Sequence, residues 1–219
     1  MSSLTVTNIV SLKSFKPNKS DSSTKSNQVE ALKQLDGAKG CKGVVFEGVA
    51  REEPDVSVRC IEWDSVEAEK SFESSATSYT KAMQSATSDT LYVRQYKLFS
   101  KVNECLSANP KCIEYVVFTL KDSVSYDEFI PHWRQALKAV EASPGCCPVA
   151  LGQGVENSQQ VVQIQGWMTL EDHIEGFKKR DDLPSIMGPL TEVVNEYVEN
   201  GWKGFKAYHL LLTAPGEAL

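Results

Sequence analysis

The alternation of apolar and polar positions predicts a similar series of elements in each half of the chain. A stretch rich in β-branched and aromatic residues opens each half, at 3–15 and at 112–124, and this composition favours a β-strand. A helical spacing follows each stretch, at 27–40 and at 125–143. In the second of these helices the apolar residues spaced by three or four positions are Tyr126, Phe129, Ile130, Trp133, Leu137 and Val140.

A second pattern, built around tryptophan, also occurs twice. The segment EWDSVEAEKSFES contains Trp63 and the segment QGWMTLEDHIEGF contains Trp167, so the two copies are 167 − 63 = 104 residues apart. A predicted hairpin leads into each tryptophan. Two positions later comes a hydroxyl residue, Ser65 or Thr169, which is a suitable N-cap for a helix with an acidic first turn.

Each half therefore has the order β-α-β-β-α-β once a last strand is added at 90–100 and at 204–213. This order is typical of the ferredoxin-like unit, an antiparallel sheet with both helices on one face. The predicted fold class is α+β, with the two bare sheet faces packed face to face as an intramolecular, pseudo-dimeric α/β barrel. The predicted ranges are 1–100 and 112–219 for the two repeats, 101–111 for the linker and 16–28 for a polar loop.

Composition and charge exclude several classes of function. The 219 residues are 41% hydrophobic and 24% charged, and the net charge of −6 gives no basic surface for nucleic acid or an anionic membrane. The first residues lack the pattern of a secretion signal, and no stretch approaches the roughly 18 apolar residues of a membrane span. We therefore expect a cytoplasmic protein whose six cysteines stay reduced.

The repeated unit resembles the dimeric α/β-barrel superfamily and, within it, the antibiotic-biosynthesis-monooxygenase-like (ABM) domains. The residues that carry the resemblance are the strand-end tryptophans and the helix starts Ser65-Val66-Glu67 and Thr169-Leu170-Glu171. It covers about residues 3–100 and 112–213. It implies a pocket in each half, between sheet and helices, for a small hydrophobic molecule. Members include cofactor-free monooxygenases, polyketide cyclases, lactone isomerases, decarboxylases, haem-degrading enzymes and stress proteins, so the fold alone selects no reaction.

Three histidines are the candidate catalytic residues, and all of them lie in the second half: His132, His173 and His209. His209 lies on a strand face shared with apolar residues, where burial adjusts the pKa of a general acid or base. His132 lies at the edge of an apolar helix stripe. His173 follows two acids in the first turn of a helix, where we expect solvent exposure. For all three, a structural or solvated imidazole is the alternative.

Aromatic residues near these histidines are candidates for contact with an aromatic substrate. They are Trp133, Phe129, Phe205 and Trp167. Ordinary core packing is the alternative for each, above all for Trp167, because Trp63 occupies the same position in the first half.

No cofactor and no metal are predicted. The Gly-x-Gly-x-x-Gly, Walker and Gly-x-Ser-x-Gly motifs are absent, and the cysteines lack C-x-x-C spacing. The histidines have no short ligand spacing, so a metal site would require the fold to gather them. Haem would require an axial histidine on a helix over a roomy pocket, and His132 could serve as that ligand.

Two functions are compatible with these observations. The first is a cofactor-independent enzyme of secondary metabolism that acts on a small hydrophobic aromatic or polyketide-like metabolite by His-assisted proton transfer, in a cyclisation, isomerisation, decarboxylation or oxygenation. The alternative is a non-catalytic hydrophobic-ligand-binding or stress-response protein, and an imidazole that reaches the pocket would favour the enzyme. A monomer or a homodimer fits either function.

Overall fold

The computed structural model describes residues 6, 8–18, 22–100 and 102–213. These residues form two compact units: unit 1 holds 97–209, and unit 2 holds 8–96 with 210–213. No helix among the described residues is long and apolar enough to cross a membrane.

Unit 2 contains the elements of the first half. They are β1 (Asn8–Pro17), α1 (Ser22–Asp36), β2 (Cys41–Ala50), β3 (Ser57–Trp63), α2 (Val66–Ser75), α3 (Thr77–Ala86) and most of β4 (Thr87–Leu98).

Unit 1 contains the elements of the second half, with a short helix before them. They are α4 (Val102–Cys105), β5 (Cys112–Thr119), α5 (Tyr126–Glu141), β6 (Cys146–Gly154), β7 (Gln160–Trp167), the π-helix η1 (Asp172–Phe177), α6 (Leu183–Tyr197), the 3-10 helix η2 (Gly201–Gly204) and the first part of β8 (Lys206–Thr213).

The described strands have the closed hydrogen-bonded order β1-β3-β2-β8-β5-β7-β6-β4. Strands β4 and β8 each begin in one unit and end in the other. The predicted fold class is therefore confirmed: the chain is α+β, with a closed antiparallel barrel order of eight strands.

The register places the two tryptophans at the same point of their sheets. Trp63 at the end of β3 pairs with Ile9 on β1, and Trp167 at the end of β7 pairs with Cys112 on β5. Both tryptophans are fully buried. Because the two registers match, each position of β1 and β3 has a corresponding position in β5 and β7, and the residues at these positions can be compared.

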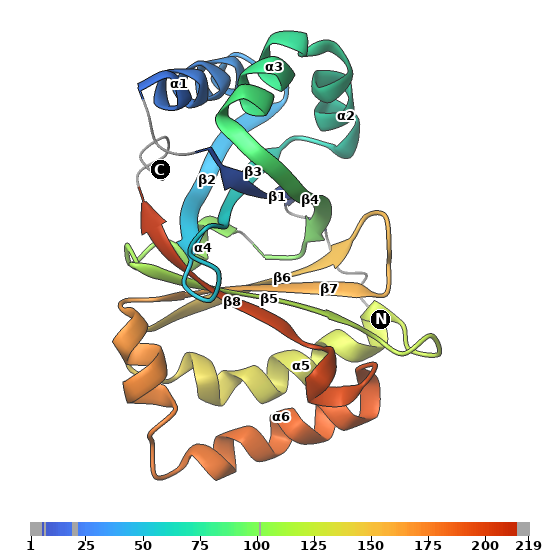
Figure 1. The fold of residues 1–219 in the computed structure, drawn as a ribbon. Coiled ribbons are helices and arrows are strands. Elements are labelled where there is room, and N and C mark those ends of the chain that lie inside the picture. The colour runs from blue at the N-terminus through green and yellow to red at the C-terminus, as the bar shows by residue number, and fades with distance from the viewer. Residues whose placement is uncertain (1–5, 7, 19–21, 101, 214–219) are drawn as a thin grey trace. The chain divides into compact units, whose positions relative to one another are not determined.

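In unit 1, α5 and α6 lie along one face of the sheet (Figure 1). The start of α5 agrees with its sequence, because the Ser125 hydroxyl accepts a hydrogen bond from the Glu128 backbone N–H at 3.2 Å. The core lies between these helices and the sheet. Its buried aromatic residues include Phe118, Phe129, Trp133, Trp167, Phe177 and Tyr197.

Two helix predictions differ from the structure. Strand β1 extends to Pro17 and helix α1 begins at Ser22, so the predicted loop at 16–28 is wrong at both ends, while 19–21 lie outside the described residues. Residues 22–28 are all polar, so no apolar spacing indicates a helix there. The single helix predicted after each tryptophan is two helices, α2 and α3 in unit 2 and η1 and α6 in unit 1.

Candidate active site

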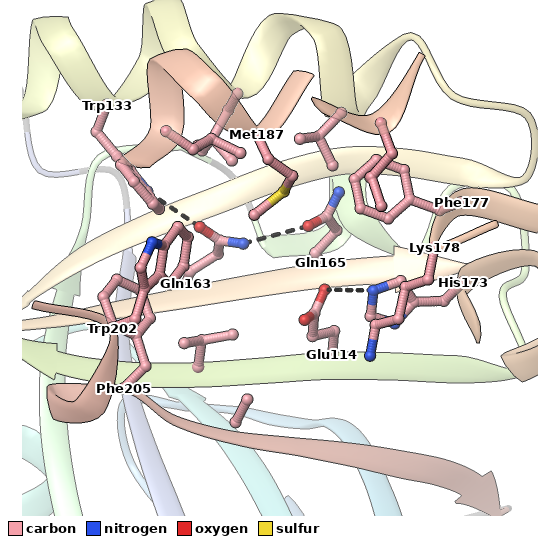
Figure 2. Close-up of a pocket in the computed structure, with 16 residues that line it drawn as sticks. Glu114, Trp133, Gln163, Gln165, His173, Phe177, Lys178, Met187, Trp202 and Phe205 are labelled. Atoms are coloured by element: carbon pink, nitrogen blue, oxygen red, sulfur yellow. Dashed lines mark hydrogen bonds and ion pairs between the residues drawn. The ribbon is translucent and has the colours of Figure 1, made fainter. Parts of the chain in front are cut away.

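A pocket of about 450 Å³ lies in unit 1, between the sheet and the helices that cover it (Figure 2). Most of its wall is apolar or aromatic. The apolar lining residues are Val116, Trp133, Leu137, Val140, Phe177, Leu183, Met187, Leu190, Trp202, Phe205 and Ala207. The polar lining residues are Glu114, Gln163, Gln165, His173 and Lys178.

Strand alternation brings the polar residues to one wall of the pocket. Glu114 and Val116 lie two positions apart on β5, and Gln163 and Gln165 lie two positions apart on β7, so each pair faces the same side of the sheet. The register pairs Glu114 with Gln165 across the two strands. The wall therefore carries a compact polar patch within an apolar cavity.

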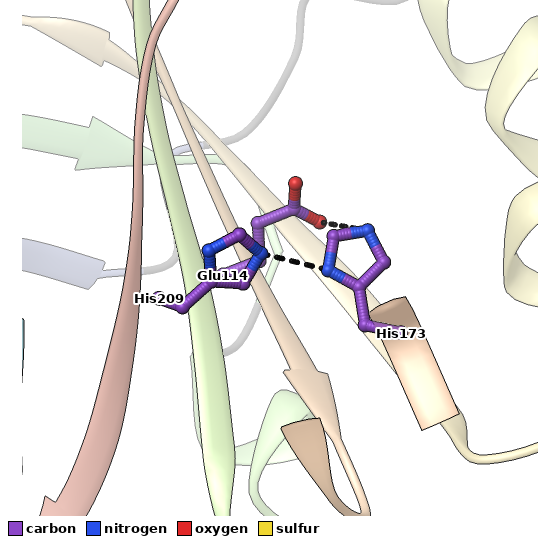
Figure 3. A group of neighbouring side chains, drawn as sticks. All are labelled: Glu114, His173 and His209. Carbon is purple, nitrogen blue, oxygen red and sulfur yellow. Dashed lines mark hydrogen bonds and ion pairs between the residues drawn. The ribbon is translucent and has the colours of Figure 1, made fainter. Parts of the chain in front are cut away.

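Glu114, His173 and His209 come together from β5, η1 and β8 (Figure 3). His173 Nδ1 lies 2.8 Å from His209 Nε2, so one of these nitrogens donates a hydrogen bond and the other accepts it. The other nitrogen of His173, Nε2, lies 3.7 Å from Glu114 Oε2. His173 therefore stands between a carboxylate that lines the pocket and a second imidazole behind it.

His173 is buried, not exposed as its sequence position suggested: only 3% of its surface is accessible. Its ring stacks on Trp167 with the ring centroids 4.5 Å apart, and Trp167 Nε1 donates to Glu114 Oε2 at 3.4 Å. Burial, the positive charge of Lys178 and the neighbouring His209 lower the pKa of His173 from 6.5 to about 3. The imidazole is therefore neutral at physiological pH.

These three side chains offer metal-ligating atoms within 4.8 Å of one another. A divalent ion would require each side chain to direct one lone pair to a common point. Glu114 and His209 instead face opposite nitrogens of His173. The geometry fits a row of proton donors and acceptors better than a metal cage.

A second polar row crosses the pocket wall (Figure 2). Trp133 Nε1 donates to Gln163 Oε1 at 3.0 Å, and Gln163 Nε2 donates to Gln165 Oε1 at 3.2 Å. Gln165 Nε2 then donates to Cys146 Sγ. Both amides are held in place by these bonds and are largely buried.

The candidate histidines lie in different environments. His173 lines the pocket, and His209 is buried behind it. His132 is exposed on α5 and stacks on Tyr197, with ring centroids 5.3 Å apart, and it does not line the pocket. The imidazole that the sequence offered as a haem ligand therefore lies outside the cavity.

Of the four residues predicted to contact a substrate, two line the pocket and two do not. Trp133 and Phe205 line the pocket. Phe129 is fully buried and stacks on Trp133, and Trp167 is fully buried against His173. These last two residues hold lining side chains in place.

Sequence reasoning missed Glu114, Gln163, Gln165 and Lys178. A signal existed for three of them, because an acid within the apolar strand CIEYVVFT and two glutamines within VVQIQGW interrupt stretches that are otherwise suited to burial. Lys178 gave no such signal, since it stands in the charged run KKRDD.

In unit 2 the same register positions hold different residues. Ser11 corresponds to Glu114, and Trp63 Nε1 donates to its hydroxyl at 3.2 Å, as Trp167 does to Glu114. Lys13 and Arg59 correspond to Val116 and Gln163. Lys13 pairs with Glu73 at 2.9 Å and Arg59 with Glu47 at 2.7 Å, so ion pairs occupy this part of unit 2.

Unit 2 has a separate hollow of about 580 Å³ on its helical side. Its lining includes Lys39, Asp64, Ser65 and Glu67, with Phe72 as the aromatic member. No histidine lines it, so it offers no imidazole for proton transfer.

Comparison with known proteins identifies the fold but not the family. No protein-family model matches the chain, and no curated protein matches its sequence. The chain is similar in structure to an anthrone oxidase-like protein, with TM-score 0.68 and 13% identity over 97% of this chain and 95% of that one. It is also similar to a chlorite dismutase from Candidatus Nitrospira defluvii, with TM-score 0.61 and 12% identity over 96% and 93% of the two chains.

A candidate monooxygenase from Fusobacterium nucleatum gives a similar result, with TM-score 0.63 and 13% identity over 94% of this chain and 92% of that chain. At such low identity these likenesses show the fold alone. The fold that they share with this chain is an α+β barrel.

Proposed function

We propose that this chain is a tandem ABM-like enzyme that works without a bound cofactor on a small hydrophobic, aromatic or polyketide-like molecule, in secondary metabolism. The observation that supports it is the pair Glu114 and His173, two proton-transfer groups at the wall of an otherwise apolar pocket. An imidazole at such a pocket favours catalysis over storage of a ligand.

In this proposal Glu114 and His173 are the catalytic residues, because both line the pocket. His209 is a positioning residue, since its hydrogen bond to Nδ1 sets which nitrogen of His173 carries the proton. His132 has no part in the reaction. Cyclisation, isomerisation and oxygenation of such molecules begin with the loss of a proton, and decarboxylation ends with the gain of one, so one proton-transfer pair serves each of them.

Hydrogen exchange of anthrone tests this function before the natural substrate is known. Anthrone is flat and aromatic, and its methylene protons are acidic. In D₂O under argon, we expect the protein to accelerate loss of the methylene signal in the NMR spectrum by about a hundredfold or more over buffer. Glu114→Gln should return the rate to near the buffer value, whereas Glu192→Gln, on the exposed side of α6, should leave it unchanged.

A chelator added to the same assay should not change the rate. If anthrone binds and its protons exchange no faster than in buffer, the non-catalytic alternative, a hydrophobic-ligand-binding or stress-response protein, is the better description.

A further inference from the structure

The hydrogen bonds of the glutamine row fix the direction in which both amides point. An indole N–H can only donate, so the atom of Gln163 that faces Trp133 must be its carbonyl oxygen. The Gln163 amide nitrogen then faces Gln165, and the Gln165 amide nitrogen faces Cys146. Each NH₂ group uses one hydrogen in this row and has a second one to donate.

Donors therefore dominate the polar part of the pocket. Gln163 and Gln165 each offer an N–H, and Lys178 adds an ammonium group at the exposed end of η1. Glu114 is an acceptor in this wall, and Trp167 and His173 already lie against it. A ligand that presents an acceptor oxygen, above all a charged one, complements this wall.

The positive charge in this region comes from Lys178. The other titratable groups around the polar wall are Glu114 on β5, Cys146 on β6, His173 on η1 and His209 on β8. Burial raises the pKa of Cys146 to about 12, so its thiol stays neutral. The charge of Lys178 reaches the site, because it is one cause of the lowered pKa of His173.

We propose that the pocket binds the oxyanion of its ligand more tightly than the neutral form: the ligand is a phenol or enol whose oxygen faces Lys178 and the amide N–H groups of Gln163 and Gln165. This rests on the proposed function in taking the ligand to be aromatic. The O–H bond of the ligand breaks, the proton passes to water, and the negative charge that remains on the ligand oxygen is balanced by the ammonium group of Lys178.

The experiment uses 2-naphthol, whose neutral and ionised forms differ in absorption and fluorescence, so the pKa of the bound molecule is read directly. We expect this pKa to fall by about one unit or more on binding, which means that naphtholate binds about tenfold or more tightly than naphthol. The shift should shrink as salt is added, because Lys178 is exposed.

Two lysine variants make a matched pair. Lys178→Met should remove most of the pKa shift of bound 2-naphthol. Lys179→Met should retain it, because Lys179 is exposed, pairs with Glu175 and does not line the pocket.

2-Methoxynaphthalene, which has no proton to lose, separates this inference from the proposed function. If both naphthalenes bind but the pKa of 2-naphthol stays the same or rises, the oxyanion site is wrong while an aromatic pocket remains. An equal loss of the pKa shift in Lys178→Met and Lys179→Met would also overturn the inference, since the charge of Lys178 would then contribute no more than that of its neighbour. If neither compound binds, the aromatic ligand itself is refuted, and this inference with it.

Discussion

His173 shows how the surroundings of a single residue set its chemistry. In the sequence it follows Glu171 and Asp172, two acids that usually mark a solvated helix start. In the fold it lies under Trp167 and against His209, and its pKa falls to about 3. Its ring is therefore neutral and lies between the carboxyl group of Glu114 and the imidazole of His209.

The pKa of His173 predicts a pH dependence of stability. The folded pKa lies below the unfolded value of 6.5, so between pH 6.5 and about 3 the unfolded state binds more protons. The contribution is therefore complete above pH 6.5 and is lost as the pH falls. Between pH 7 and pH 5 the free energy of unfolding should drop by about 2 kcal/mol more in the wild type than in His173→Asn, measured by urea unfolding. Equal drops in the two proteins would show that His173 is not shielded from protonation in the fold.

Trp167 gives a second prediction at this scale. Trp167→Phe keeps an aromatic ring over His173 but removes the N–H that Trp167 donates to Glu114. We expect the anthrone exchange rate to fall by about tenfold, the energy of one hydrogen bond to a charged group, with little change in anthrone affinity. Trp63→Phe is the matched control, because Trp63 donates to Ser11 in unit 2. Similar rates in the two variants would argue against a role for the indole N–H in orienting Glu114.

Among the elements, η1 decides the position of the site. The backbone N–H of Lys178 donates to the carbonyl of His173, five residues earlier, which is the π-helical pattern. His173 and Phe177 are buried on the same side of this turn, and Lys178 stays exposed beside them. π-Helical turns are rare and occur often at functional sites. The apolar spacing of the sequence predicts an α-helix here and gives no sign of the wider turn.

Gly145, the residue before β6, leaves room for the side chain of Asp172 at the start of η1. Gly145 has φ +78°, and a Cβ added there would lie 2.6 Å from the Asp172 side chain, which accepts hydrogen bonds from Thr169. Gly145→Ala should lower the free energy of unfolding by about 1–3 kcal/mol through strain and should shift η1 away from His209.

Gly176→Ala, within η1, is the comparison for this substitution. A Cβ there meets only the Glu171 carbonyl oxygen, at 3.9 Å, so we expect a gain of about 0.5–1 kcal/mol. Urea unfolding measures both variants. A neutral Gly145→Ala would mean that Asp172 moves without cost and that η1 does not depend on this turn.

For the whole molecule, the two halves share an architecture but not a pocket chemistry. The positions of Val116 and Gln163 in unit 1 are Lys13 and Arg59 in unit 2, each within an ion pair. We therefore predict one binding site for 2-naphthol per chain by isothermal titration calorimetry. A stoichiometry of two would contradict this.

Two tryptophan substitutions locate the site within the molecule. Met187→Trp places a large ring in the pocket of unit 1 and should weaken 2-naphthol binding by at least about tenfold, the loss of roughly 1.4 kcal/mol of contact. Ser71→Trp fills the hollow of unit 2 and should leave binding unchanged. The reverse result would place the site in unit 2.

The sequence by itself determined the fold class and most element positions. Hydrophobic spacing, turn residues and the repeated tryptophan segment are local signals, and a strand or helix whose buried face they mark has few alternatives. The same signals missed the polar start of α1 and the division of the helix after each tryptophan, because neither carries an apolar period.

Only the tertiary structure decided the site. Glu114, His173 and His209 belong to three elements, and the first and last of these residues are 209 − 114 = 95 positions apart in the sequence. No local sequence pattern predicts that these elements come into contact. His173 and His132 are similar candidates in the sequence, yet the first is buried and neutral and the second is exposed beside Tyr197. Proton transfer depends on distances and on burial, and both arise only when the strands are paired and the helices are packed on them.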